Sequence, residues 1–264
     1  SSDVCSSDLG MKVEGVDLGT LIAQYAGLFM AYLLWLRYYR PLRKYISRKQ
    51  LFTHDAMKRL FQVNRDIFLR TLCLVAVTVF FTSTGAAFGD VVLAVNTLLM
   101  QLFTLFSYIM DGFAYAGEAL TGKYIGAGNR QELRRTIRHL FGWGIALSLA
   151  FTMLYGIGGK EFLGLLTNEQ SVISASGDYF YWVLAIPLAG FAAFLLDGIC
   201  IGATSTHIML KAMVVASGSF FLIYYSLHNV LHNHALWLGF IVYLALRGIM
   251  QALLLNSSSL RTAR

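Results

Sequence analysis

The chain has 264 residues, of which 57% are hydrophobic and 13% carry a formal charge, and its formal net charge at pH 7 is +7. Soluble domains have about a quarter of their residues charged, so this composition excludes an ordinary soluble globular enzyme. The positive charge does not indicate a nucleic-acid partner, because the basic residues are concentrated in a few polar gaps between long apolar runs.

Residues 1–9, SSDVCSSDL, differ in character from the rest of the chain, since Ser-Ser-Asp occurs twice in a short polar stretch. They lack the basic start and apolar core of a signal peptide. We interpret them as a non-native-looking leader outside the fold, and expect the native sequence to begin near Gly10, within a longer protein.

The first apolar run, Leu18–Leu36, predicts a membrane-spanning helix within residues 10–40. Pro41 breaks it, and residues 41–64 form a basic, amphipathic connector that we expect to lie along the membrane surface. Six further spans are predicted within residues 65–256, followed by a tail at 257–264. Spans two to seven are Thr71–Phe88, a span that begins at Val91, 140–159, Tyr179–Ala203, Ala212–Leu227 and Leu236–Leu255.

Basic residues predict the orientation of these spans. Of the 21 lysines and arginines, 19 fall in alternate gaps or from the last span onward, Arg247 included, and the other two are Lys12 and Lys160. By the positive-inside rule, the chain begins outside and its C-terminus is cytoplasmic. The sequence therefore predicts an all-α polytopic membrane protein with about seven transmembrane helices.

Three acids lie within the apolar runs. Asp111 and Glu118 follow the run VVLAVNTLLMQLFTLFSYIM, and Asp197 lies in the fifth span. Acids in lipid are costly, so we expect these three to face protein or water. They either couple transport to a cation or form structural ion pairs. Arg247 within the last span and Arg70 at the start of the second are the expected ion-pair partners.

Polar and aromatic side chains in the second and third spans are candidates for lining a substrate cavity; in the alternative, they form hydrogen bonds between helices or pack the core. These candidates are Thr82, Ser83, Asn96, Gln101, Ser107, Tyr108, Phe113 and Tyr115.

A metal site and an enzyme active site are not expected. His228, His232 and His234 are close in sequence but have no cysteine or carboxylate near them, which favours ordinary interface polarity over a metal site. Cys73 and Cys200 lie in apolar runs, and no HExxH, GxSxG or P-loop pattern is present. The sequence therefore predicts no enzyme and no cofactor.

Several motifs occur in a fixed order: LGTLIAQ at 18–24, NRDIFLR at 64–70, DGFAYAGE at 111–118, LDG at 196–198, NHALW at 233–237 and LALRG at 244–248. Together they resemble the multidrug and toxic compound extrusion (MATE) family, and within it the branch of DNA-damage-inducible protein F. Members have twelve helices in two lobes around a central cavity.

The resemblance implies that this chain supplies helices 6–12: the last helix of the N-terminal lobe (10–40), the cytoplasmic lobe linker (41–64) and the C-terminal six-helix lobe (65–256). It implies multidrug efflux by antiport with H⁺ or Na⁺ across a bacterial inner membrane. The partners would be small amphipathic or cationic substrates, the bilayer and the missing N-terminal lobe. The first helix of the family, where the proton-coupling aspartate of this branch is usually placed, is not in the chain, so the coupling ion stays open.

Two other functions compete with this interpretation. A lipid-linked sugar flippase of the same superfamily would need a basic cavity for a diphosphate, whereas the cavity candidates here are neutral or acidic. A non-transporting membrane scaffold would use the same acids for assembly alone.

Overall fold

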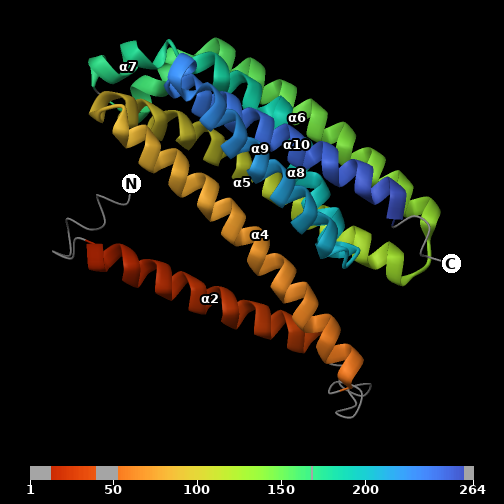
Figure 1. The fold of residues 1–264 in the computed structure, drawn as a ribbon. Helices are drawn as coiled ribbons and strands as arrows, with labels where there is room; N and C mark the ends of the chain where they lie inside the picture. Colours follow the sequence, from red (N-terminus) through yellow and green to blue (C-terminus); the bar gives the residue numbers. More distant parts are fainter. Residues whose placement is uncertain (1–12, 40–52, 168, 259–264) are drawn as a thin grey trace. The chain divides into compact units, whose positions relative to one another are not determined.

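The computed structural model describes residues 13–39, 53–167 and 169–258, and every secondary-structure element among them is a helix (Figure 1). Seven of these helices are long and apolar enough to cross a membrane, so the predicted all-α membrane fold is confirmed. The helices are α2 (Val13–Tyr39), α4 (His54–Ala87), α5 (Asp90–Gly126), α6 (Arg130–Leu166), α7 (Gln170–Ser176), α8 (Phe180–Gly202), α9 (Thr206–Leu231) and α10 (Asn233–Ser258).

The chain divides into two compact units, Ser1–Leu60 and Phe61–Arg264. In the first unit, α2 contains the span predicted at Leu18–Leu36, and its large apolar side chains are exposed within the described structure. The predicted leader at 1–9 and most of the tail at 257–264 lie outside the described residues.

The connector predicted at 41–64 is described only from residue 53. Its last part, from His54 onward, is not a separate surface helix, because it runs without a break into the second span as the first turns of α4. No glycine or proline interrupts this stretch before Gly85, so nothing in the sequence ends the helix. The boundaries of the proposed lobe linker remain a prediction.

In the second unit, α8 lies at the centre and is the most buried of the spans. It packs against α5 through the glycines of a GxxxG pattern. A Cβ atom at Gly198 would lie 2.0 Å from the carbonyl oxygen of Ala114, and one at Gly202 would lie 2.4 Å from that of Glu118. Only glycine allows this approach, which is typical of helix pairs in membranes.

Several helices extend beyond their apolar runs. The fourth span, predicted at 140–159, belongs to α6, which begins at Arg130 after Asn129 accepts a hydrogen bond from the backbone N–H of Glu132 (3.1 Å). The sixth span, predicted at 212–227, is α9. Hydropathy marks the part of a helix inside the hydrocarbon, whereas hydrogen bonding and caps set where the helix ends.

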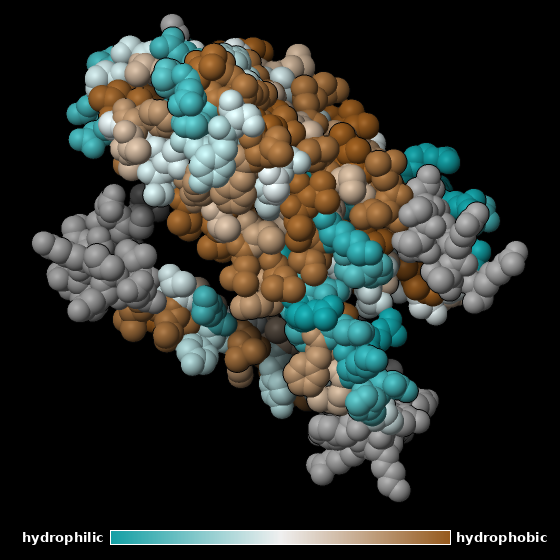
Figure 2. Space-filling model, viewed as in Figure 1, coloured by the Kyte–Doolittle hydropathy of each residue, from teal (hydrophilic) through white to brown (hydrophobic). Residues whose placement is uncertain are grey.

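The ends of the bundle differ in charge. Lys123, Arg130, Arg134 and Lys211 lie toward the end where α5 passes into α6 and α8 passes into α9, which we name the basic end. Hydrophobic residues cover the middle of the bundle in Figure 2, and hydrophilic ones gather toward its ends.

Candidate functional site

Three helices meet at a buried charge cluster around Asp197 of α8. Its Oδ2 atom accepts hydrogen bonds from the guanidinium groups of Arg70 on α4 and Arg247 on α10. Its Oδ1 atom accepts one from the Gln251 side chain (2.7 Å). Asp197 is 6% exposed and Arg247 is 3% exposed, so the carboxylate is enclosed by these donors.

Helical spacing explains how α10 supplies two of these groups. Arg247 and Gln251 are four residues apart and therefore project from the same face of the helix. Between them, Gly248 brings α10 close to α8, because a Cβ atom there would lie 3.1 Å from the backbone nitrogen of Ala193. The Arg247 guanidinium also lies over the ring of Phe194, 5.5 Å from its centroid.

The cluster carries more positive than negative charge. Two arginines share one carboxylate, and the Nε atoms of Arg70 and Arg247 and the Oε1 atom of Gln251 have no hydrogen-bond partner among the described residues. Asp111 on α5 is partly buried and lies within electrostatic range of Arg247, Asp197 and Arg70. It forms no ion pair or hydrogen bond with any described residue. A charged Asp111 would balance the cluster.

The two predicted arginine partners thus both contact Asp197, and neither contacts Asp111. Removing one member of such a buried pair leaves an uncompensated charge, which is strongly unfavourable. The Asp197 carboxylate is therefore paired on both oxygens in this conformation, whereas no donor in the described part of the chain occupies the Asp111 carboxylate.

Next to Asp111, one face of α5 is open. Tyr108 and Tyr115 are seven residues apart and are 72% and 70% exposed, and Gln101 lies seven residues before Tyr108 on the same face. Gly112 lies between the tyrosines, with no atom within 4 Å of where its Cβ would be. Glu118 is partly buried without a hydrogen-bond partner among the described residues. We refer to Gln101, Tyr108, Gly112 and Tyr115 as the α5 face.

The other cavity candidates lie elsewhere. Thr82 and Ser83 are exposed on α4, and the Thr82 hydroxyl donates to the carbonyl of Thr78 (3.1 Å). Ser107 is partly buried and donates to the carbonyl of Thr104 (2.8 Å). Phe113 is partly buried and packs against the hydrophobic core. The hydrogen bonds of Thr82 and Ser107 lie within their own helices, so they match neither a cavity lining nor the bonds between helices that the alternative expects. Phe113 packs as the alternative expects.

Asn96 is 2% exposed and joins helices instead of lining an open surface. Its side chain exchanges two hydrogen bonds with Asn233 and accepts a third from the indole of Trp237 (2.9 Å). For Asn96 this arrangement matches the alternative interpretation, hydrogen bonding between helices. Asn233 and Trp237 belong to the NHALW motif noted in the sequence, but no sequence pattern predicts that they contact Asn96.

The sequence interpretation missed two further polar contributors. Gln251 is uncharged, so its place in an apolar helix does not by itself indicate a buried partner. Its contact with Asp197 can be inferred only once Arg247, four residues earlier, is known to face that acid. Asp66, buried on α4, accepts a hydrogen bond from Arg65 (3.0 Å) and one from the Thr206 hydroxyl at the start of α9 (3.3 Å). Within NRDIFLR, Arg70 thus contacts α8 and Asp66 contacts α9.

No group of three metal-binding side chains occurs among the described residues. His234 is enclosed by aromatic rings instead, and its Nδ1 atom lies within hydrogen-bonding distance of the Tyr181 hydroxyl (3.0 Å) and the Trp182 indole nitrogen (3.2 Å). His228 stacks against Tyr224.

Comparison with known proteins gives a consistent result. The family model MatE matches residues 67–225. The chain is 39% identical over 250 residues to DNA damage-inducible protein F of Escherichia coli (strain K12), covering 92% of this chain and 53% of that protein. It is 22% identical over 241 residues to Protein DETOXIFICATION 42 of Arabidopsis thaliana, covering 90% and 45%. The chain spans about half the length of these relatives.

Proposed function

The chain belongs to the MATE family of transporters, in the branch of DNA damage-inducible protein F, and from this premise we propose that it serves in multidrug efflux by antiport with H⁺ or Na⁺. The substrates would be small amphipathic or cationic compounds. The missing half of the cavity would come from an N-terminal lobe of the same protein.

We place the protein in a bacterial inner membrane with its basic end and C-terminus in the cytoplasm. The alternation of basic and non-basic gaps along seven spans supports this orientation. Rocking of one lobe against the other around a site between them would then carry substrate outward.

The α5 face supports the choice of substrate. Its two exposed tyrosines, 72% and 70% accessible, offer aromatic faces for a lipophilic cation. Gln101 adds a polar group on the same face, and Gly112 leaves space between the rings. A flippase for a diphosphate substrate would need free cations here, but the partly buried Arg70 and the buried Arg247 are both held by Asp197.

One observation carries the coupling proposal: Asp111 lies beside the charge cluster and the α5 face, yet no described donor occupies its carboxylate. A carboxylate in that position exchanges a proton or a sodium ion when its exposure alternates. Substrate bound at Tyr108 and Tyr115 would compete with that ion. Asp197 holds the helices together while this exchange occurs.

The test uses a chimaera in which this chain replaces the matching half of E. coli DNA damage-inducible protein F. We expect the chimaera to export a cationic dye from cells, the chain alone to export none, and Asp111→Asn to abolish export. Asp178→Asn, an exposed acid before α8, is the matched control and keeps export. Repeating the assay over a pH and a sodium series identifies the ion.

Two outcomes would contradict the proposal. Export that persists in Asp111→Asn at the level of Asp178→Asn would remove Asp111 from coupling. If a stable, membrane-inserted chimaera exports no dye under any gradient, the protein is a scaffold and not an exporter.

A further inference from the structure

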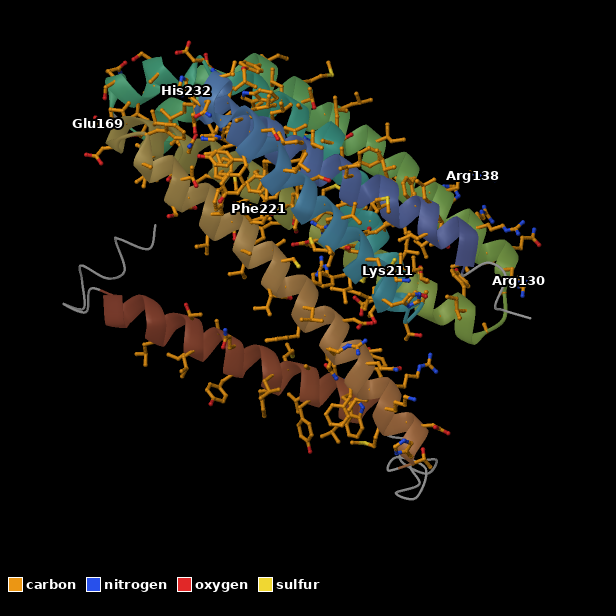
Figure 3. The ribbon with its side chains drawn as sticks, in the orientation of Figure 1. Arg130, Arg138, Glu169, Lys211, Phe221 and His232 are labelled. Carbon is orange, nitrogen blue, oxygen red and sulfur yellow. The ribbon has the colours of Figure 1, made fainter. Side chains whose placement is uncertain are left out.

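The start of α6 carries a dense group of arginines around one recess. Arg130, Arg134 and Arg138 follow one another at four-residue intervals, and Arg135 and His139 lie beside them on the helix. With Gln131, they line a recess of about 760 Å³, which we name the arginine recess. Figure 3 shows the side chains of Arg130 and Arg138 at the same end of α6.

The positive charge of the arginine recess is largely uncompensated. Glu132 is the one acid in this stretch, and its carboxylate lies 3.8 Å from the Arg135 guanidinium. Arg130, Arg134 and Arg138 form no ion pair or hydrogen bond with the part of the chain that the structure describes. The N-terminus of α6 adds further positive potential. Membrane orientation alone requires basic residues at this end but does not require them to line one recess.

An apolar surface continues directly from the arginine recess. Arg135, His139 and Trp143 are spaced by four residues and lie on one face of α6, and Trp143 is 64% exposed. Leu149 and Met153 extend the exposed apolar surface toward the middle of the span. Tryptophan is enriched where the hydrocarbon meets the head groups. The surface therefore suits a ligand that is anionic at one end and apolar at the other.

We propose that the arginine recess binds the head group of an anionic phospholipid, whose acyl chains lie along Trp143 and the apolar surface of α6. Guanidinium groups bind phosphate through paired, charge-assisted hydrogen bonds, so several arginines around one recess match a phosphodiester. A zwitterionic lipid has the same phosphate but carries its own cation, which the excess positive charge of the recess repels.

The experiment measures lipid retained by the purified chain in native mass spectrometry, with phosphatidylglycerol and phosphatidylcholine of identical acyl chains. We expect preferential retention of phosphatidylglycerol. Arg134→Gln with Arg138→Gln should lower its affinity by roughly tenfold to thirtyfold, as expected for two basic residues near the membrane surface. The matched control, Lys58→Gln with Lys211→Gln, removes the same charge from exposed positions elsewhere and should retain the lipid.

Because Arg134 and Arg138 are exposed, the double variant should fold normally, and its circular dichroism should equal that of the control. Equal retention of phosphatidylglycerol by the two double variants would overturn the proposal. A second variant, Trp143→Ala, separates a lipid from a soluble phosphate. If inorganic phosphate displaces the lipid and Trp143→Ala changes nothing, the recess takes a soluble anion and the proposal is also overturned.

Discussion

Asn96 of α5 and Asn233 of α10 exchange two hydrogen bonds across their helix interface, at 2.8 and 3.0 Å. The Trp237 indole donates a third bond to the same Asn96 oxygen. Gly85 of α4 lies against this pair, since a Cβ atom there would be 2.9 Å from the Asn96 amide nitrogen. One asparagine therefore joins α5 to α10 beneath the surface of α4.

Replacing Asn96 by alanine should lower the free energy of unfolding by about 2–4 kcal/mol. Interhelical hydrogen bonds in membrane proteins contribute about 0.6 kcal/mol on average and up to about 1.7 each, and the substitution also leaves buried partners unpaired. Asn233→Ala should cost less, because the bond from Trp237 to Asn96 survives. Unfolding in detergent measures both effects. Thr97→Val, at an exposed neighbour, is the control, and equal stability of Asn96→Ala and this control would contradict the prediction.

Replacing Gly198 by alanine should separate α5 from α8. The new Cβ atom would meet the Ala114 carbonyl oxygen at 2.0 Å, and this backbone atom cannot move aside as a side chain could. We expect a loss of about 3 kcal/mol or more. Gly112→Ala is the matched control on α5, because no atom lies within 4 Å of its Cβ position. Thermal unfolding checks the pair, and similar midpoints would show that the helices do not pack at Gly198.

Replacing Asp197 by alanine should destabilise the bundle by about 3–5 kcal/mol, because Arg247 is then buried without a counter-charge. Adding Arg247→Met removes that charge, so the double variant should be more stable than Asp197→Ala alone. Glu132→Ala breaks an exposed pair and should change stability by at most about 1 kcal/mol. Unfolding in detergent ranks the three variants. A double variant less stable than Asp197→Ala would mean that Arg247 stabilises the fold through other contacts.

The spans were predictable because hydropathy reports directly on the hydrocarbon core, and each predicted span lies within or closely overlaps one described helix. The ends of the helices were not predictable to the same degree. Arg130–Arg138 reads as a polar gap, yet it is the first part of α6, because arginine is a good helix former outside the membrane. The short helix α7 lies in a polar stretch whose few apolar residues are too short a run to indicate a span.

At the candidate site, charge was the informative property. Arg247 needed a buried acid, and that requirement alone pointed to Asp197 or Asp111. The sequence did not distinguish between them, because the choice depends on how α10 rotates against α8 at Gly248. Neutral polar groups can stay in an apolar helix without a counter-charge, so Gln251 was missed and the two interpretations of Asn96, cavity lining and hydrogen bonding between helices, could not be separated.

The contact between α5 and α8 has a consequence for any cycle of the transporter. At Gly198 and Gly202 the two backbones touch, with no side chain between them that could change rotamer and absorb a displacement. Two helices packed backbone to backbone should move as one rigid body. Asp111 on α5 and Asp197 on α8 would then keep a constant separation, and in the proposed mechanism the ion that Asp111 exchanges would have to enter from outside this pair of helices.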